Sequence, residues 1–356
     1  MRRLLILTTA LTGMGFAAQA QITVMSWGGA YETSQVEGYN KPFTAATGTP
    51  VLMVAADNPN APIKAMVEAG NVTVDVVDLE YADAVRLCDE GMLEPIDAAV
   101  LPPAPDGTPA TEDFLPGAVT DCAVASIVFS TVFAYDTSKL PEGPTTIADF
   151  FDLEKFPGKR GLRKGAKANL EMALMADGVP AGEVYAMLET PEGLDRAFAK
   201  LDTIKSDVVW WETGAQPPQL LADGEVVMTT AYNGRIFNAA ITENKPFQVV
   251  WDGQVYEYDV FAIPKGAPNA EAALEYIKFA TATEQLARQA SWISYGPARK
   301  SSGPLVGLFN DGKTEMAPHM PTAEANLANA LPSSYEFWAD RDAELNERFN
   351  AWLAAS

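Results

Sequence analysis

The stretch from residue 229 to residue 264 decides the fold, and it reads TTAYNGRIFNAAITENKPFQVVWDGQVYEYDVFAIP. Near its start a strand ends at Tyr232 and breaks through Asn-Gly into a helix that begins with Arg235. Near its end an apolar strand over 256–263 carries Asp259, a residue type that strand interiors rarely hold without a partner or a role. We expect Asp259 and Arg235 to face one cleft, where Asp259 would meet a cationic group and Arg235 an anionic one.

The first 20 residues have the pattern of a secretory signal peptide. Arg2 and Arg3 precede an apolar run that is too short to span a bilayer, and an Ala-Gln-Ala site follows it. A buried N-terminal helix would explain neither the arginines nor this site. We therefore expect cleavage after Ala20 and an exported protein of the periplasm, long enough for two domains of about 100–200 residues each.

Composition limits the partners. The chain has 47 acidic and 25 basic residues, a net charge of −22, which becomes about −24 without the two leader arginines. Such a surface excludes nucleic acid and anionic membranes as partners. In an exported chain, Cys88 and Cys122 favour one disulfide, worth about 3–4 kcal/mol, over a metal site. The single histidine, His319, excludes multi-histidine zinc sites, and we expect neither metal nor cofactor.

Strands alternate with helices along the chain, which predicts an α/β fold of the doubly wound kind. The apolar run 123–135 is long for one strand and fits a strand that leaves one lobe and enters the next. We predict a discontinuous lobe one, made of 21–135 plus 256–356, and an inserted lobe two at 136–255. Lobe two should hold separate strands such as 247–251, and residues 256–263 should return to lobe one.

Several residues at strand ends are candidates for the cleft. Trp27 ends the first strand before a Gly-Gly turn and a helix, an arrangement that builds ligand sites in α/β sheets but lacks the dinucleotide-binding pattern. Glu80 and Tyr81 follow the third strand, although Glu80 would also suit a helix cap. Trp210 and Trp211 alternate on their strand, so only one faces a cleft, and we choose Trp211 because it is nearer the strand end.

Five ordered motifs together resemble the spermidine/putrescine-binding branch of the solute-binding proteins of ABC importers. They are SWGG at 26–29, EGMLEPID at 90–97, PGK at 157–159, AYNG at 231–234 and DVFAIP at 259–264. The resemblance implies a two-lobed periplasmic binding protein in which each lobe is a mixed sheet flanked by helices and hinge strands cross between the lobes. It also implies a non-enzymatic protein, which we expect to be a monomer, that delivers a small amine to an inner-membrane ABC permease.

The same resemblance assigns roles to particular residues. It implies that Asp259 grips a ligand ammonium group and that Trp27, Tyr232 and Tyr295 form aromatic walls. A carboxylate combined with aromatic faces is a physically sound receptor for a desolvated ammonium, since each cation–π contact contributes roughly 0.5–2 kcal/mol.

The sequence departs from the polyamine pattern at three places. Residues 163–168 read RKGAKA where polyamine binders carry acids, Glu257 replaces an aromatic residue, and Arg235 follows the Asn-Gly pair. Opposed charges at Asp259 and Arg235 would suit a zwitterion such as γ-aminobutyrate, with a bidentate arginine–carboxylate contact. A true putrescine or spermidine binder remains the alternative.

Two further interpretations stay open. Arg235 would also fit an ordinary surface helix or a salt bridge to Glu212 or Glu243. An exported hydrolase is the distant alternative, with Glu257 and Asp259 as a carboxylate pair on one strand face.

Overall fold

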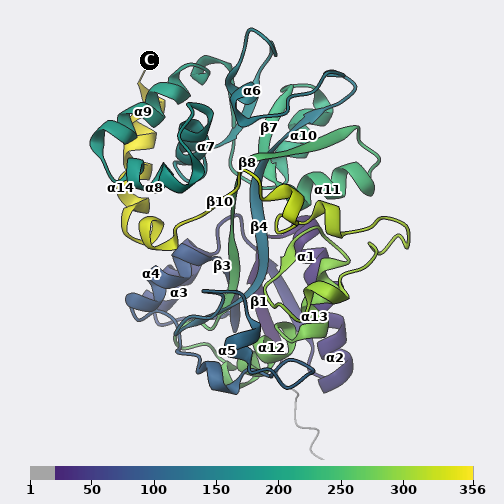
Figure 1. Cartoon of the computed structure of the whole chain (residues 1–356). Coiled ribbons are helices and arrows are strands. Elements are labelled where there is room, and N and C mark those ends of the chain that lie inside the picture. The colour runs from purple at the N-terminus through teal and green to yellow at the C-terminus, as the bar shows by residue number, and fades with distance from the viewer. Residues whose placement is uncertain (1–20, 356) are drawn as a thin grey trace, which may run out of the picture.

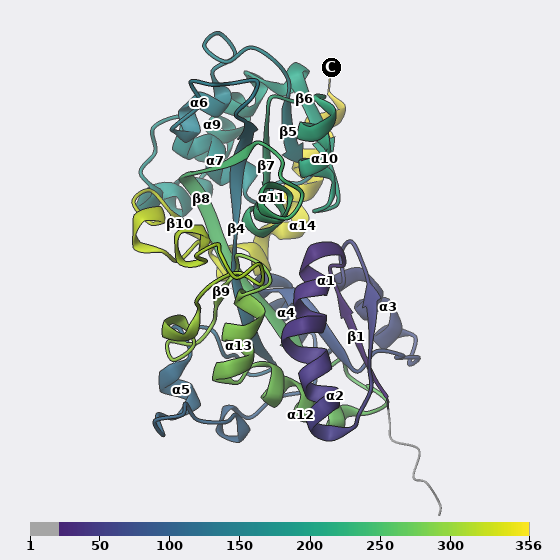
Figure 2. The ribbon, with the colours of Figure 1, turned by 90° about the vertical axis from the view of Figure 1, so that its right-hand side faces the viewer.

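A computed structural model describes residues 21–355, and the predicted signal peptide lies outside them. Two lobes are stacked one above the other and joined by long strands that run through both (Figure 1). The architecture is the mixed α/β one expected from the sequence, with helices packed on both faces of the sheet when the molecule is turned (Figure 2).

The lower lobe in Figure 1 is built around an apolar core from residues 22–125 and 258–298. Its elements are β1 (Ile22–Ser26), α1 (Gly29–Gln35), η1 (Val36–Asn40), α2 (Lys41–Thr47), β2 (Val51–Ala55), α3 (Asn60–Glu68), β3 (Val76–Glu80), α4 (Tyr81–Asp89), η2 (Ala98–Val100), α5 (Ala110–Asp113), α12 (Ala270–Ala280) and α13 (Thr283–Ala290).

The upper lobe has its own core, which is dominated by residues 133–204. Its elements are α6 (Ile147–Phe151), β5 (Arg160–Arg163), α7 (Asn169–Ala176), η3 (Ala181–Glu183), α8 (Val184–Leu188), α9 (Pro191–Asp202), η4 (Lys205–Asp207), β6 (Val208–Trp211), α10 (Gln216–Asp223), β7 (Met228–Tyr232) and α11 (Asn233–Ile241). Local sequence sets the helix starts: Thr146 and Asp149 form a capping box before α6, and Thr190 caps α9 ahead of Pro191.

Two long strands tie the lobes together, and the sheet is continuous through them in the order β2-β1-β3-β8-β4-β7-β5-β6. They are β4 (Ala123–Asp136) and β8 (Phe247–Ala262), which pair antiparallel along nearly their whole length. The predicted crossing strand is therefore present. Expecting two strands in place of β8 was wrong: Gly253, at φ 74°, lets the chain form a bulge between the two expected strands, so that β8 runs through.

The segment after α13 crosses back over the hinge and ends in the long helix α14 (Tyr335–Ala354). It carries β9 (Gly296–Pro297), η5 (Gly303–Leu305), η6 (Ala317–His319), η7 (Glu324–Asn326) and β10 (Leu331–Pro332).

The position of α14 departs from the expected lobe boundary. The helix lies beside α8 and α9 of the upper lobe (Figure 1), and Trp338 and Phe349 belong to the core of that lobe. The indole Nε1 of Trp338 donates to buried Glu171 of α7 at 2.7 Å. The sequence could not indicate which core the apolar face of this helix covers.

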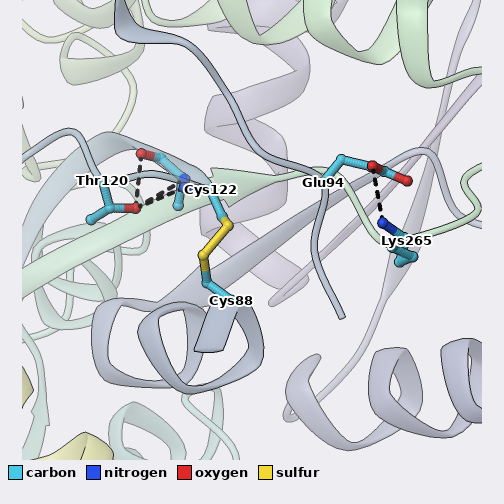
Figure 3. The surroundings of a disulfide bond; sticks show 6 residues. Cys88, Glu94, Thr120, Cys122 and Lys265 are labelled. Carbon is cyan, nitrogen blue, oxygen red and sulfur yellow. Dashed lines mark hydrogen bonds and ion pairs between the residues drawn. A yellow bond between two sulfur atoms is a disulfide. The ribbon is translucent and has the colours of Figure 1, made fainter. Parts of the chain in front are cut away.

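Cys88 of α4 and Cys122 at the start of β4 are joined by a disulfide, as predicted (Figure 3). The bond fixes α4 to a crossing strand in the lower lobe, and it closes a loop across a sequence separation of 34. Within residues 21–355 no helix is long and apolar enough to cross a membrane.

Candidate ligand-binding site

A cavity of about 340 Å³ lies between the lobes, where the carboxyl ends of β1, β3 and β7 meet the middle of β4 and β8. Six of the eight predicted site residues line it: Trp27, Glu80, Tyr232, Arg235, Asp259 and Tyr295. Both lobes contribute, because Trp27 and Glu80 come from the lower lobe and Tyr232 and Arg235 from the upper one.

Asp259 is the buried anion of the cavity. It lies on β8 directly opposite Glu80 of β3, only 5 % of its surface is exposed, and its Oδ1 is buried without a hydrogen-bond partner among residues 21–355. Burial raises the pKa of Asp259 well above its ordinary value, and the negative charges of Asp78, Glu80 and Glu257 raise it further. A cation placed against this carboxylate would reverse that shift, so the site favours a positively charged group.

Arg235 is the buried cation of the cavity and comes from the first turn of α11. It crosses between the lobes: its Nη1 donates to the carbonyl of Gly28 at 2.9 Å and its Nη2 to that of Trp27 at 3.3 Å. Its Nε is buried and has no hydrogen-bond partner in the part of the chain that the structure describes. A guanidinium has five N–H donors, so the Nε edge is left to take an anionic oxygen. The two alternative interpretations, a surface position and a salt bridge to Glu212 or Glu243, are both wrong.

Aromatic rings form the walls between these two charges. Tyr295 packs edge-on against Tyr31 at 5.4 Å between ring centroids, and Tyr232 packs edge-on against Phe129 at 5.5 Å. The indole Nε1 of Trp27 is also buried without a partner. The walls therefore present ring surfaces together with a spare N–H donor.

Close packing around the charges leaves little room for side chains at two glycines. A Cβ on Gly29, whose φ is 62°, would lie 2.5 Å from Arg235 Nη1. A Cβ on Gly234 would lie 2.6 Å from Tyr295 Cε1. The Gly-Gly turn and the Asn-Gly pair seen in the sequence thus make space for Arg235 and Tyr295.

Glu80 lines the cavity, but its charge is already matched. Arg163 Nη1 donates to Glu80 Oε1 at 2.9 Å, and Lys167 Nζ donates to Glu80 Oε2 at 3.0 Å and also to Glu257. Burial alone would raise the pKa of Glu80, but the charges of Lys167 and Arg163 outweigh it and lower the pKa to about 2. Glu80 is therefore an ionised residue paired across the lobes.

Two predicted site residues do not reach the cavity. Tyr81 lies on the other side of the hinge, where its hydroxyl donates to the carbonyl of Gly117 and its ring packs on Tyr335. Trp211 is 1 % exposed and packs edge-on behind Tyr232 at 5.6 Å, so it supports a wall without forming one. A position near a strand end does not show whether a side chain packs against other residues or faces the cleft.

Sequence reasoning missed several lining residues. Tyr31 follows the Gly-Gly turn by two residues, Phe129 lies in the middle of β4, and a loop at 212–215 also lines the cavity. Tyr31 could have been found from its place next to the turn. The loop could not, since no local pattern distinguishes it from other connections.

Comparison with known proteins identifies the family. The family model for bacterial extracellular solute-binding proteins matches residues 39–322. This chain is a bacterial extracellular solute-binding protein.

Among characterised solute-binding proteins, the chain is 46 % identical to a gamma-aminobutyric acid-binding protein of Pseudomonas aeruginosa, across 97 % of this chain and 96 % of that one. It is 27 % identical to the spermidine/putrescine-binding periplasmic protein of Escherichia coli, across 66 % and 68 % of the two chains. Among solved structures it resembles a GABA receptor (33 % identity, 95 % and 98 % covered, TM-score 0.79). It also resembles the binding protein MotA of A. tumefaciens B6 in complex with glucopine (30 % identity, 94 % and 100 % covered, TM-score 0.85).

Proposed function

We propose that this solute-binding protein is the periplasmic component of an ABC importer and that it captures γ-aminobutyrate or a closely similar ω-amino acid. One observation carries the proposal: Asp259 Oδ1 and Arg235 Nε, atoms of opposite charge, are both buried without partners and line the same cavity. A zwitterion with separated charges satisfies both at once. The 46 % identical relative from Pseudomonas aeruginosa is named for this ligand.

The energetics favour such a ligand. A hydrogen bond to a charged group contributes about 1.5–3 kcal/mol, and it gains specificity when the arginine contact is bidentate. The walls of Trp27, Tyr232 and Tyr295 add cation–π and apolar contact. A cavity of about 340 Å³ is at the small end of ligand pockets, as a small amino acid requires.

Binding would be coupled to hinge closure. Within residues 21–355, only the crossing strands and the terminal segment connect the lobes covalently, whereas Arg235 connects them through the carbonyls of Trp27 and Gly28. A carboxylate on Arg235 and an ammonium on Asp259 would add contacts that exist only when the lobes are together. The closed form would then dock on an inner-membrane permease.

The rival ligands fit less well. A polyamine would bring a second ammonium into a site that already contains the buried positive charge of Arg235. An enzymatic role for Glu257 and Asp259 is disfavoured because Glu257 is bonded to Lys167.

Isothermal titration of the mature protein with γ-aminobutyrate, putrescine and butyrate tests the proposal. We expect saturable binding of γ-aminobutyrate and at least about 100-fold weaker binding of the other two, since each lacks one charge contact worth about 3 kcal/mol. Preference for putrescine would refute the zwitterion proposal.

A further inference from the structure

A row of carboxylates crosses the sheet beneath the cavity. Glu80 and Asp259 are directly paired across β3 and β8, and Glu257 lies two residues before Asp259 on the same face. Three acids on one face would form a strongly cation-attracting surface, suited to more than one ammonium group.

The protein neutralises only part of this row. Lys167 bridges Glu80 and Glu257 while its side chain is only 11 % exposed, and Arg163 holds the other oxygen of Glu80. Glu80 borders both the ligand cavity and a second, polar hollow of about 310 Å³ that is lined by Lys167 and Arg163. The ammonium of Lys167 therefore pairs with Glu80 and Glu257 from the second hollow, and Lys167 does not line the ligand cavity.

The loop that carries Lys167 is held in an unusual conformation. Ala168, the next residue, has a φ of 66°, a left-handed conformation that costs a residue with a side chain about 1–3 kcal/mol. The amide of Asn169 fastens the loop by donating to the carbonyls of Arg163 at 2.6 Å and Gly165 at 2.8 Å. Such a strained and braced loop fixes where Lys167 points.

We propose that Lys167 determines specificity by supplying a built-in ammonium to the two carboxylates, Glu80 and Glu257, that would otherwise take the second cationic group of a diamine. The inference rests on the proposed function and extends it. With Lys167 present, Glu80 and Glu257 are matched and Asp259 is left to take one amine. A diamine meets a resident positive charge, and the protein accepts solutes with a single ammonium.

Lys167→Met tests this directly, because methionine keeps most of the stem and removes the ammonium. Lys200→Met, which removes the same charge on α9 beside Phe151, is the matched control. We expect wild type and Lys200→Met to bind γ-aminobutyrate and to reject putrescine. Lys167→Met should gain at least about tenfold in putrescine affinity, through the freed carboxylates. Lys167→Gln serves as a second uncharged variant if the methionine variant fails to fold.

The outcomes separate this inference from the proposed function. Lys167 variants that bind γ-aminobutyrate but show no gain for putrescine overturn the role of Lys167 and leave the proposed function standing. Wild-type protein that binds putrescine well also overturns it. If wild type ignores γ-aminobutyrate while Lys167→Met alone gains putrescine binding, the proposed function fails and the role of Lys167 is supported.

Discussion

Asp259 and Glu80 are both carboxylates at neighbouring positions of the sheet, yet one lacks a partner and the other is paired with basic residues. They face each other across β8 and β3 and are both largely buried. Glu80 is bound by Arg163 and Lys167, whereas the Oδ1 of Asp259 has no partner. Accordingly, the pKa of Glu80 is lowered to about 2 and that of Asp259 is raised. The paired carboxylate of Glu80 links the two lobes, and the unpaired carboxylate of Asp259 is available to a ligand.

The largest effect should come from removing the unmatched charge. Asp259→Asn should weaken γ-aminobutyrate binding at least about 100-fold, or about 3 kcal/mol, because the ammonium loses its counter-charge. It should leave the thermal stability of the unliganded protein unchanged or slightly raised, since burying this carboxylate is unfavourable. Asp57→Asn, the same change at the exposed rim of the cavity, is the control and should bind nearly as wild type. Equal losses in both variants, measured by titration, would contradict the assignment.

The same change at Glu80, the paired carboxylate, should lower the stability of the protein, whereas at Asp259 it lowers ligand affinity. Glu80→Gln leaves Arg163 and Lys167 short of an anion and should destabilise the protein by about 2 kcal/mol, since removing one partner of a buried ion pair strands the other. Calorimetric melting should show a clear drop in Tm without ligand. A variant with wild-type stability would mean that the cluster contributes nothing to closure.

A smaller loss of γ-aminobutyrate affinity is expected from a substitution that keeps the positive charge of Arg235 but changes its geometry. Arg235→Lys retains a cation but lacks the planar fork that reaches the carbonyls of Gly28 and Trp27 and offers its Nε edge to the ligand. We predict about a tenfold loss of γ-aminobutyrate affinity, or about 1.4 kcal/mol. Unchanged affinity would show that the ligand carboxylate binds elsewhere.

The smallest of the expected effects is the dependence of γ-aminobutyrate affinity on pH. At pH values below the raised pKa of Asp259 the unliganded carboxylate is protonated, and a bound ammonium lowers that pKa, so ligand binding in that pH range releases a proton. Affinity should therefore fall by up to about tenfold per pH unit as pH drops through the raised value, and should level off above it. Titrations in buffers of different ionisation enthalpy measure the released proton. In Asp259→Asn this dependence should vanish.

The sequence allowed prediction of the fold and of the two opposed charges, because both have local signatures. Asp259 interrupts an apolar strand, and Arg235 follows an Asn-Gly break. The sequence did not allow prediction of contacts between residues that lie far apart in the chain. Lys167 was visible as a departure from the polyamine pattern, but its contacts lie 87 and 90 residues away, at Glu80 and Glu257.

The sequence also did not show which core a given helix or side chain packs against. The residues of α14 were expected in lobe one, because only the assembled core shows that Trp338 reaches Glu171. Trp211 illustrates the same limit at a single residue, since a buried tryptophan behind Tyr232 and one facing a cleft have the same local sequence.

The most direct measurement is a crystal structure of the mature protein with γ-aminobutyrate. The ligand nitrogen is predicted to lie about 3 Å from the carboxylate of Asp259, with the ligand carboxylate on the Nε edge of Arg235 and the lobes closed around both. A ligand bound in the reverse direction, or outside the cavity between Asp259 and Arg235, would contradict the central claim.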